Sequence, residues 1–190
     1  MANDNDLLLV TKVLQGDRNA FAAIVDNHKD MAVSIAFNIL LNQEDAEEVA
    51  QDSFVKAFKA LAAFKGQSKF STWFYRIIIN TALNKKKGKK QQTIFLEESV
   101  YENLPAENDN LLSKAIRKQS KEQILTALSE LSNSERICIS LYYLEELSVE
   151  EIHEVSAISV SNIKVLLHRA RKRLFTILQL QLKNEITDLI

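Results

Sequence analysis

The side chains best suited to chemistry in this chain are basic groups gathered in two segments, and the chemistry they fit is binding to a polyanion. Residues 65–90 contain eight Lys or Arg and no acid, and residues 160–174 contain five and again no acid. Acidic residues gather elsewhere, in residues 44–52, 97–109 and 145–154. The net charge is only −1, so it is the separation of sign that indicates two surfaces for a polyanion and others that avoid it or bind a basic protein.

Residue types needed for catalysis or metal binding are sparse. Cys138 is the single cysteine, and the histidines His28, His153 and His168 are far apart in the sequence. We find no phosphate-binding glycine loop and no nucleophile–base pair, so we expect no enzyme activity, no catalytic residue, no metal and no cofactor. No apolar run approaches about 18 residues and the N-terminus is acidic, which predicts no membrane insertion and a cytoplasmic location.

Helices must position these segments, because three glycines and one proline in 190 residues are too few for the turns of a β fold. Apolar residues recur at helical spacing over residues 46–61 and 70–81, and the stripe of the second segment places Trp73 and Phe74 in the core. The predicted fold class is all-α, with two small helical domains. They comprise residues 1–91 and 115–190, and a flexible acidic linker, 92–114, joins them.

The second domain carries the pattern of a helix-turn-helix. Two Ser-x-x-Glu capping boxes, Ser132 with Glu135 and Ser148 with Glu151, predict helix starts near residues 133 and 149. A tight connection at residues 156–158 then leads to a longer helix capped by Ser159, and the N-terminal side chains of such a helix contact base edges in the major groove. The predicted DNA-binding residues are Ser161, Asn162, Lys164, Val165, His168, Arg169, Arg171 and Lys172. We expect the early members of this set to read bases and the later arginines and lysine to bind phosphates.

Three strings in this order resemble bacterial RNA polymerase sigma factors of the extracytoplasmic-function (ECF) type, in the sigma-70 family. They are residues 45–54 (DAEEVAQDSF), residues 64–80 with FKG and FSTWFYRI, and residues 128–174 with the helix-turn-helix. The resemblance spans about residues 5–178 and leaves the linker and the C-terminal tail unmatched. It departs from the family pattern at Ala157, where a glycine is usual, and at residues 161–166 (SNIKVL), so the base preference is expected to differ.

The resemblance implies that the chain binds core RNA polymerase and promoter DNA, reads the minus-thirty-five and minus-ten elements, and melts the latter. It implies docking on the β′ clamp helices through Asp45, Glu48, Gln51 and Asp52, and a second-domain contact with the β flap. The implied minus-ten residues are Gln67, Ser68, Lys69, Phe70, Ser71, Arg76, Asn80, Asn84 and Lys87. The linker is expected in the active-site cleft. The apolar tail, residues 176–190, is expected to extend the last helix or to meet a further partner such as an anti-sigma factor.

Two other functions are compatible with the residue pattern taken without the resemblance. One is a stand-alone two-domain helix-turn-helix transcription regulator, which would bind duplex DNA tightly without polymerase. The other is a helical protein-interaction adaptor, which would show no salt-dependent binding to nucleic acid.

Overall fold

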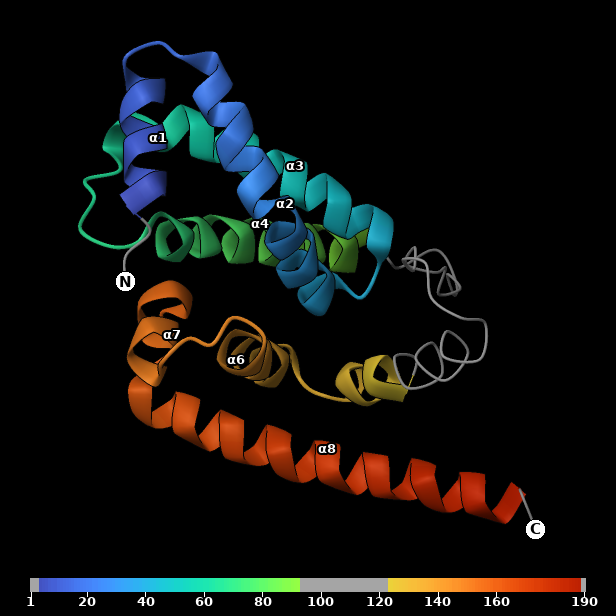
Figure 1. Cartoon of the computed structure of the whole chain (residues 1–190). Coiled ribbons are helices and arrows are strands. Elements are labelled where there is room, and N and C mark those ends of the chain that lie inside the picture. Colours follow the sequence, from blue (N-terminus) through green and yellow to red (C-terminus); the bar gives the residue numbers. More distant parts are fainter. Residues whose placement is uncertain (1–3, 93–122, 189–190) are drawn as a thin grey trace.

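The computed structural model describes residues 4–92 and 123–188, and every regular element in these two ranges is helical. The first range holds α1 (Asp4–Leu14), α2 (Arg18–Leu40), α3 (Gln43–Ala60), the 3-10 turn η1 (Leu61–Ala63) and α4 (Phe70–Gln92). The second holds a short helical stretch at residues 123–129, then α6 (Asn133–Tyr143), α7 (Val149–Ser156) and α8 (Val160–Asp188). Figure 1 shows the two groups of helices one above the other. The predicted all-α class is confirmed for the described residues.

Local capping explains why the chain turns between α2 and α3. Leu41 adopts a left-handed conformation (φ 57°) that ends α2, and its backbone N–H donates to the carbonyl of Phe37. The next residue, Asn42, is extended and caps α3 through a 2.9 Å bond that its side-chain oxygen accepts from the Asp45 N–H. Asn42 is therefore the N-cap of α3.

The core of the first group is formed by the inward sides of α2, α3 and α4. Ile24, Ile39, Val49, Phe74 and Ile78 are each at most 1% exposed. Burying a side chain of this size stabilises the fold by about 1.5–3 kcal/mol relative to leaving it in water. The buried positions of α4 fix which of its sides is left polar, because the helix repeats every 3.6 residues.

Both predicted capping boxes are present in the second group. The Ser132 and Ser148 hydroxyls accept from the backbone N–H three residues on, while Glu135 and Glu151 reach back to the cap residues. These contacts begin α6 at residue 133 and α7 at residue 149, as predicted. Ala157 then ends α7 in a left-handed conformation (φ 58°) and the chain turns into α8.

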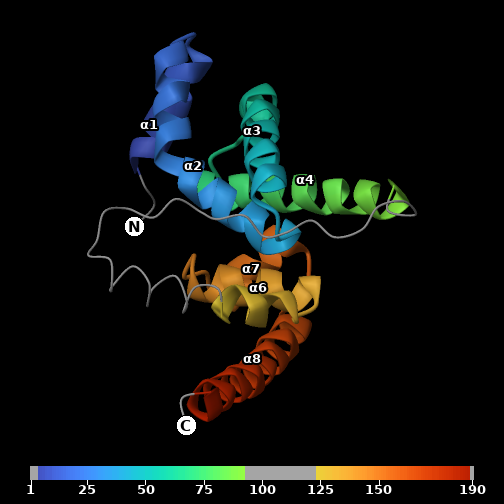
Figure 2. The same ribbon diagram turned by 90° about the vertical axis from the view of Figure 1, so that its right-hand side faces the viewer.

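The two groups contact each other along two seams. Helix α6 packs against α2, and α7 lies against α4. Figure 2, turned by 90°, also shows α7 beneath α4, with α8 extending away from the first group. The predicted linker lies outside the described residues, apart from residue 92 at the end of α4, as does the start of the second domain at residue 115.

None of the described helices combines the length and the apolar character needed to cross a membrane. The single cysteine, Cys138, is fully buried in α6, and burial raises the pKa of its thiol to about 11.

Candidate promoter and polymerase interfaces

The amino-terminal half of α8 presents one exposed polar side. Ile163, Leu167 and Ala170 are at most 3% exposed and fasten the helix to its own domain. The residues on the other side of the helix are exposed. We call them the minus-thirty-five face: Ser161, Asn162, Lys164, Val165 and His168. This agrees with the predicted orientation of the helix, because the side chains expected at base edges point away from the protein.

The turn before α8 is held by its own side chains. The His153 ring nitrogen Nδ1 lies 2.8 Å from the carbonyl oxygen of Ile158, and the Ser156 hydroxyl donates to the Ile152 carbonyl at 2.6 Å. The Ser159 hydroxyl accepts from the Asn162 N–H at 3.4 Å, as expected for a helix cap. These bonds fix the angle between α7 and α8, on which the reach of the minus-thirty-five face depends.

The basic residues farther along α8 differ in how they are held. Arg169 and Lys172 are exposed. The guanidinium of Arg171 lies 5.4 and 5.5 Å from the ring centres of Tyr142 and Tyr143, and its Nε donates to the Tyr143 hydroxyl at 2.8 Å. Sequence reasoning missed this cation–π contact, because nothing in the spacing of residues 142–143 and 171 shows that α6 and α8 bring them together. Arg171 is therefore an exposed candidate for binding a DNA phosphate, and two aromatic rings already orient its guanidinium.

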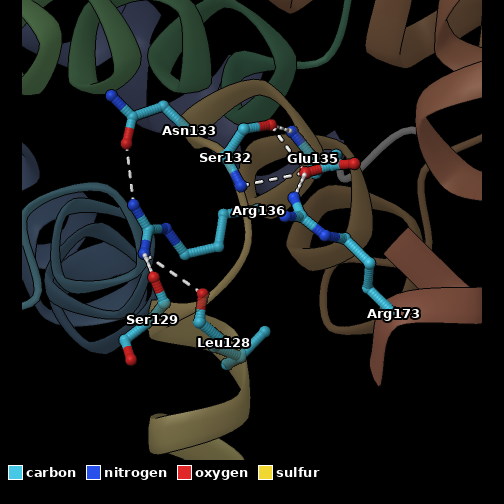
Figure 3. Close-up of polar contacts among 7 residues, drawn as sticks. All are labelled: Leu128, Ser129, Ser132, Asn133, Glu135, Arg136 and Arg173. Carbon is cyan, nitrogen blue, oxygen red and sulfur yellow. Dashed lines mark hydrogen bonds and ion pairs between the residues drawn. The ribbon is translucent and has the colours of Figure 1, made fainter. Parts of the chain in front are cut away.

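A buried arginine joins the helical stretch 123–129 to α6 (Figure 3). Arg136 is 3% exposed, and its guanidinium donates to the carbonyls of Leu128 and Ser129 at 3.1 and 3.3 Å and to the Asn133 side chain at 2.7 Å. A cation at the carboxyl end of a helix satisfies carbonyls that have no partner within that helix. The resemblance included this residue, but its role as a helix-end clamp could not be read from the sequence.

The neighbouring Glu135 connects the capping box of α6 to helix α8. Its Oε2 accepts from the Ser132 backbone and hydroxyl and from Arg173 of α8, at 2.7–3.1 Å (Figure 3). Burial raises the pKa of this carboxyl, but the bonds from Ser132 and the charge of Arg173 outweigh burial and hold the pKa below its ordinary value. The carboxylate is thus kept ionised where α6 and α8 meet.

The polar side of α4 carries the other predicted DNA residues. Arg76, Asn80, Asn84 and Lys87 are exposed along the helix, and Gln67 and Lys69 are exposed in the preceding loop. That loop turns at Gly66 (φ 67°), where an added Cβ would lie 3.3 Å from the Leu7 side chain. Ser68 and Ser71 are half-buried. We call this set the minus-ten face: Gln67, Ser68, Lys69, Ser71, Arg76, Asn80, Asn84 and Lys87.

Phe70 is a correction to the predicted minus-ten set. Its side chain is 1% exposed and packs against Phe64, Trp73 and Phe74, with ring centres 5.6–5.9 Å apart. A ring in this position supports the loop from below and cannot stack on a base. Phe74 is fully buried, as predicted. Trp73 is only half-buried, with its ring 5.2 Å from that of Phe64.

The outward side of α3 is acidic, with one exception to the prediction. Glu48, Gln51 and Asp52 are exposed, whereas Asp45 is buried at 9% and lies 3.4 Å from the Lys85 ammonium of α4. Burial lowers the pKa of Lys85, but its bonds to Glu48 and Asp45 outweigh burial and raise that pKa. Asp45 therefore fastens α3 to α4, and the expectation that it is an exposed docking residue is wrong.

Comparison with known proteins agrees with this geometry. Residues 24–92 match the family described as Sigma-70 region 2, and residues 121–174 match Sigma-70, region 4. The ECF RNA polymerase sigma factor SigW of Bacillus subtilis is 32% identical over 177 residues, which cover 87% of this chain and 92% of SigW. The chain belongs to the ECF sigma factors. As a member of this family it binds core RNA polymerase and promoter DNA and directs promoter recognition and transcription initiation, without being an enzyme itself.

Other relatives of this ECF sigma factor extend over a similar length. The ECF RNA polymerase sigma-E factor of Salmonella typhimurium is 29% identical over 174 residues, covering 88% of this chain and 91% of the relative. Two solved structures share the fold. One is CnrH in complex with the cytosolic domain of CnrY (TM-score 0.67, 23% identity, 92% and 97% of the two chains). The other is RpoE of Bartonella quintana with the anti-sigma factor NepR (TM-score 0.68, 24% identity, 84% and 96%).

Proposed function

We propose that this ECF sigma factor divides promoter opening among three of its surfaces. The minus-thirty-five face of α8 reads duplex DNA, the minus-ten face of α4 holds the melted strand, and Glu48, Gln51 and Asp52 of α3 dock on the β′ clamp helices. The observation that carries this assignment is that most members of each set are exposed on a helix whose other side is core, and the rest of the minus-ten face lies at the start of α4 and in the loop before it. Such a chain works together with polymerase in the cytoplasm.

On α8, the side chains of the first turns contact the bases. Lys164 suits guanine, Asn162 suits adenine and Val165, which is 44% exposed, suits a thymine methyl group. Arg169, Arg171 and Lys172 bind phosphates, which holds the register and makes affinity depend on salt. Leu166 is 9% exposed, so it packs in the core and contributes nothing to base contact.

On α4, a polar row beside a basic end suits single-stranded DNA. An unpaired base is held by hydrogen bonds or stacking, and the freed strand is held by positive charge. Gln67 and Ser68 lie in the loop before α4, and Arg76 and Asn80 are exposed on α4 about one helical turn apart.

The docking surface on α3 has an apolar neighbour that sequence reasoning missed. Val55 and Phe58 are 52% and 48% exposed, and the Phe58 ring packs edge-on against Phe21 of α2 at 4.9 Å. We include both in the polymerase contact, because protein interfaces combine an apolar centre with a polar rim. An anti-sigma factor is a further proposed partner, since the RpoE relative is solved with one.

Run-off transcription with purified core polymerase on a library of promoter fragments tests the function. We expect promoter-specific transcripts only when the chain is added, and gel shifts with duplex DNA only when core polymerase is present. Tight, sequence-specific duplex binding by the chain alone, without transcripts, would support the stand-alone regulator instead.

Matched variants distinguish the role of the docking surface from that of the minus-ten face. Gln51→Ala with Asp52→Ala should weaken retention of core polymerase in a pull-down, while Asp26→Asn on the exposed side of α2 should leave retention unchanged. Asn80→Ala should lower permanganate reactivity of the melted element while polymerase retention stays at the wild-type level. Equal retention by the double variant and the Asp26 control would refute the docking surface.

A further inference from the structure

The amino-terminal helix α1 lies against the segment that leads into the minus-ten face, although no residue of α1 belongs to that face. We call residues 64–69, between η1 and α4, the minus-ten loop. Helix α1 packs on α2 and on η1, and Figure 1 shows the connection from α3 to α4 passing beside α1. The loop turns at Gly66, where an added Cβ would lie 3.3 Å from Cδ2 of Leu7. Helix α1 therefore borders the loop directly at its turn.

A buried polar pair joins α1 to α2 below this turn. Asp6 is 3% exposed, an uncommon position for a carboxylate, and its Oδ2 lies 3.1 Å from Nε2 of His28. Its other oxygen, Oδ1, is buried and has no hydrogen-bond partner in the described part of the chain. Burying a carboxylate is costly unless it is bonded, and a hydrogen bond is directional. The pair therefore fixes both the position of α1 on α2 and the orientation of the His28 ring.

The His28 ring in turn contacts the residue at which α4 begins. Its centre lies 5.3 Å from that of Phe70 and 6.5 Å from that of Phe74, within the range of interacting aromatic rings. Phe70 is followed and preceded in the chain by Ser71 and Lys69, two members of the minus-ten face. Because a close-packed core transmits displacements, the place of the Phe70 ring determines where these polar neighbours lie.

We propose that Asp6 and Leu7 of α1 are positioning residues for the minus-ten loop, Asp6 through His28 and Phe70, and Leu7 through the turn at Gly66. The inference rests on the function proposed above and adds residues that support that same site. A site that already has its bound conformation captures an unpaired base more tightly, because affinity falls in proportion to the competent fraction. Helix α1 thus contributes to promoter melting without contacting DNA.

Fluorescence of Trp73 tests the positioning in the free full-length chain. Trp73 is the only tryptophan, it is half-buried, and its ring centre lies 5.6 Å from that of Phe70. Asp6→Ala and Leu7→Ala should each raise the acrylamide quenching constant of Trp73. Asp6→Asn keeps the size of the side chain and a hydrogen bond to His28, so it should keep the wild-type constant. Val13→Ala removes a core contact farther along α1 and is the matched control.

Binding of single-stranded DNA tests the consequence for the minus-ten face. The probe is a fluorescent oligonucleotide with the non-template minus-ten strand of a promoter found in the run-off library, added to holoenzyme assembled with each variant. Asp6→Ala and Leu7→Ala should each weaken its binding about three- to tenfold, the value of one lost hydrogen bond or comparable contact. Asp6→Asn and Val13→Ala should bind as the wild type does, and all four variants should retain core polymerase equally in a pull-down.

A merely structural role for α1 predicts a different pattern. Asp6→Ala and Val13→Ala would then both lower the urea midpoint, while oligonucleotide affinity at a temperature where each is folded by circular dichroism would not change. If Asp6→Ala does not fold, Leu7→Ala decides, because Leu7 is 37% exposed and contributes less to the core.

Wild-type oligonucleotide affinity in Leu7→Ala and in any folded Asp6→Ala would overturn the proposal, and so would an equal loss of affinity in Val13→Ala. Failure of the proposed function has another signature. The wild-type holoenzyme would then neither transcribe nor bind the oligonucleotide, and quenching of Trp73 alone would decide whether α1 sets the position of Phe70.

Discussion

Replacing Ala157 by glycine should stabilise this sigma factor, although glycine usually weakens helical proteins. Ala157 ends α7 at φ 58° and ψ 15°, a left-handed conformation that costs an L-residue about 1–2 kcal/mol. Glycine adopts it without that cost, but loses about 0.5–1 kcal/mol more backbone entropy on folding. Because the Ala157 side chain is exposed, no packing is lost. The net gain is about 0.5–1 kcal/mol, which corresponds to roughly 1–4 °C in melting temperature for a chain of this size.

The measurement is urea denaturation followed by circular dichroism, with calorimetry for the melting temperature. The matched control is Ala22→Gly, at an exposed position inside α2, which should cost about 1 kcal/mol because its backbone is already helical. The same change from alanine to glycine should therefore raise the free energy of unfolding at residue 157 and lower it at residue 22. A loss of stability in Ala157→Gly similar to that of the control would refute the assignment of strain to this turn.

Three other variants probe the helix-turn-helix domain. Arg136→Met should lower the free energy of unfolding by about 3 kcal/mol, because two part-buried carbonyls lose the guanidinium donor and Asn133 keeps only its bond from Lys86; a loss below about 1 kcal/mol in urea titrations would contradict the clamp. Glu135→Gln should flatten the acid dependence of stability. A carboxyl whose pKa is lowered in the fold stabilises fully above its unfolded value near 4.5, and this contribution is lost as pH falls through the lowered pKa, so the urea midpoints of variant and wild type should converge towards acid pH. Lys164→Ala should weaken holoenzyme binding by about 1–3 kcal/mol on the preferred promoter and much less on fragments changed at the base it reads, whereas a loss uniform over all fragments would make Lys164 a phosphate contact.

The local features of the fold could be predicted because short-range rules determine them. The capping boxes at Ser132 and Ser148 and the cap at Asn42 depend on residues three positions apart, and all three are present. The orientation of α8 followed from its apolar repeat in the same way. These signals lie within one or two helical turns, so no knowledge of the tertiary arrangement was needed.

The errors concern residues whose role depends on a partner far along the chain. Asp45 fits the exposed acidic pattern of α3, but Lys85, forty positions later, draws it into an ion pair. Phe70 is next to polar loop residues and still packs fully inward, because its ring contacts those of Phe64 and Trp73. The contact of Arg76 with Glu154 spans 78 positions. Periodicity predicts which side of a helix is polar, but not what lies against that side.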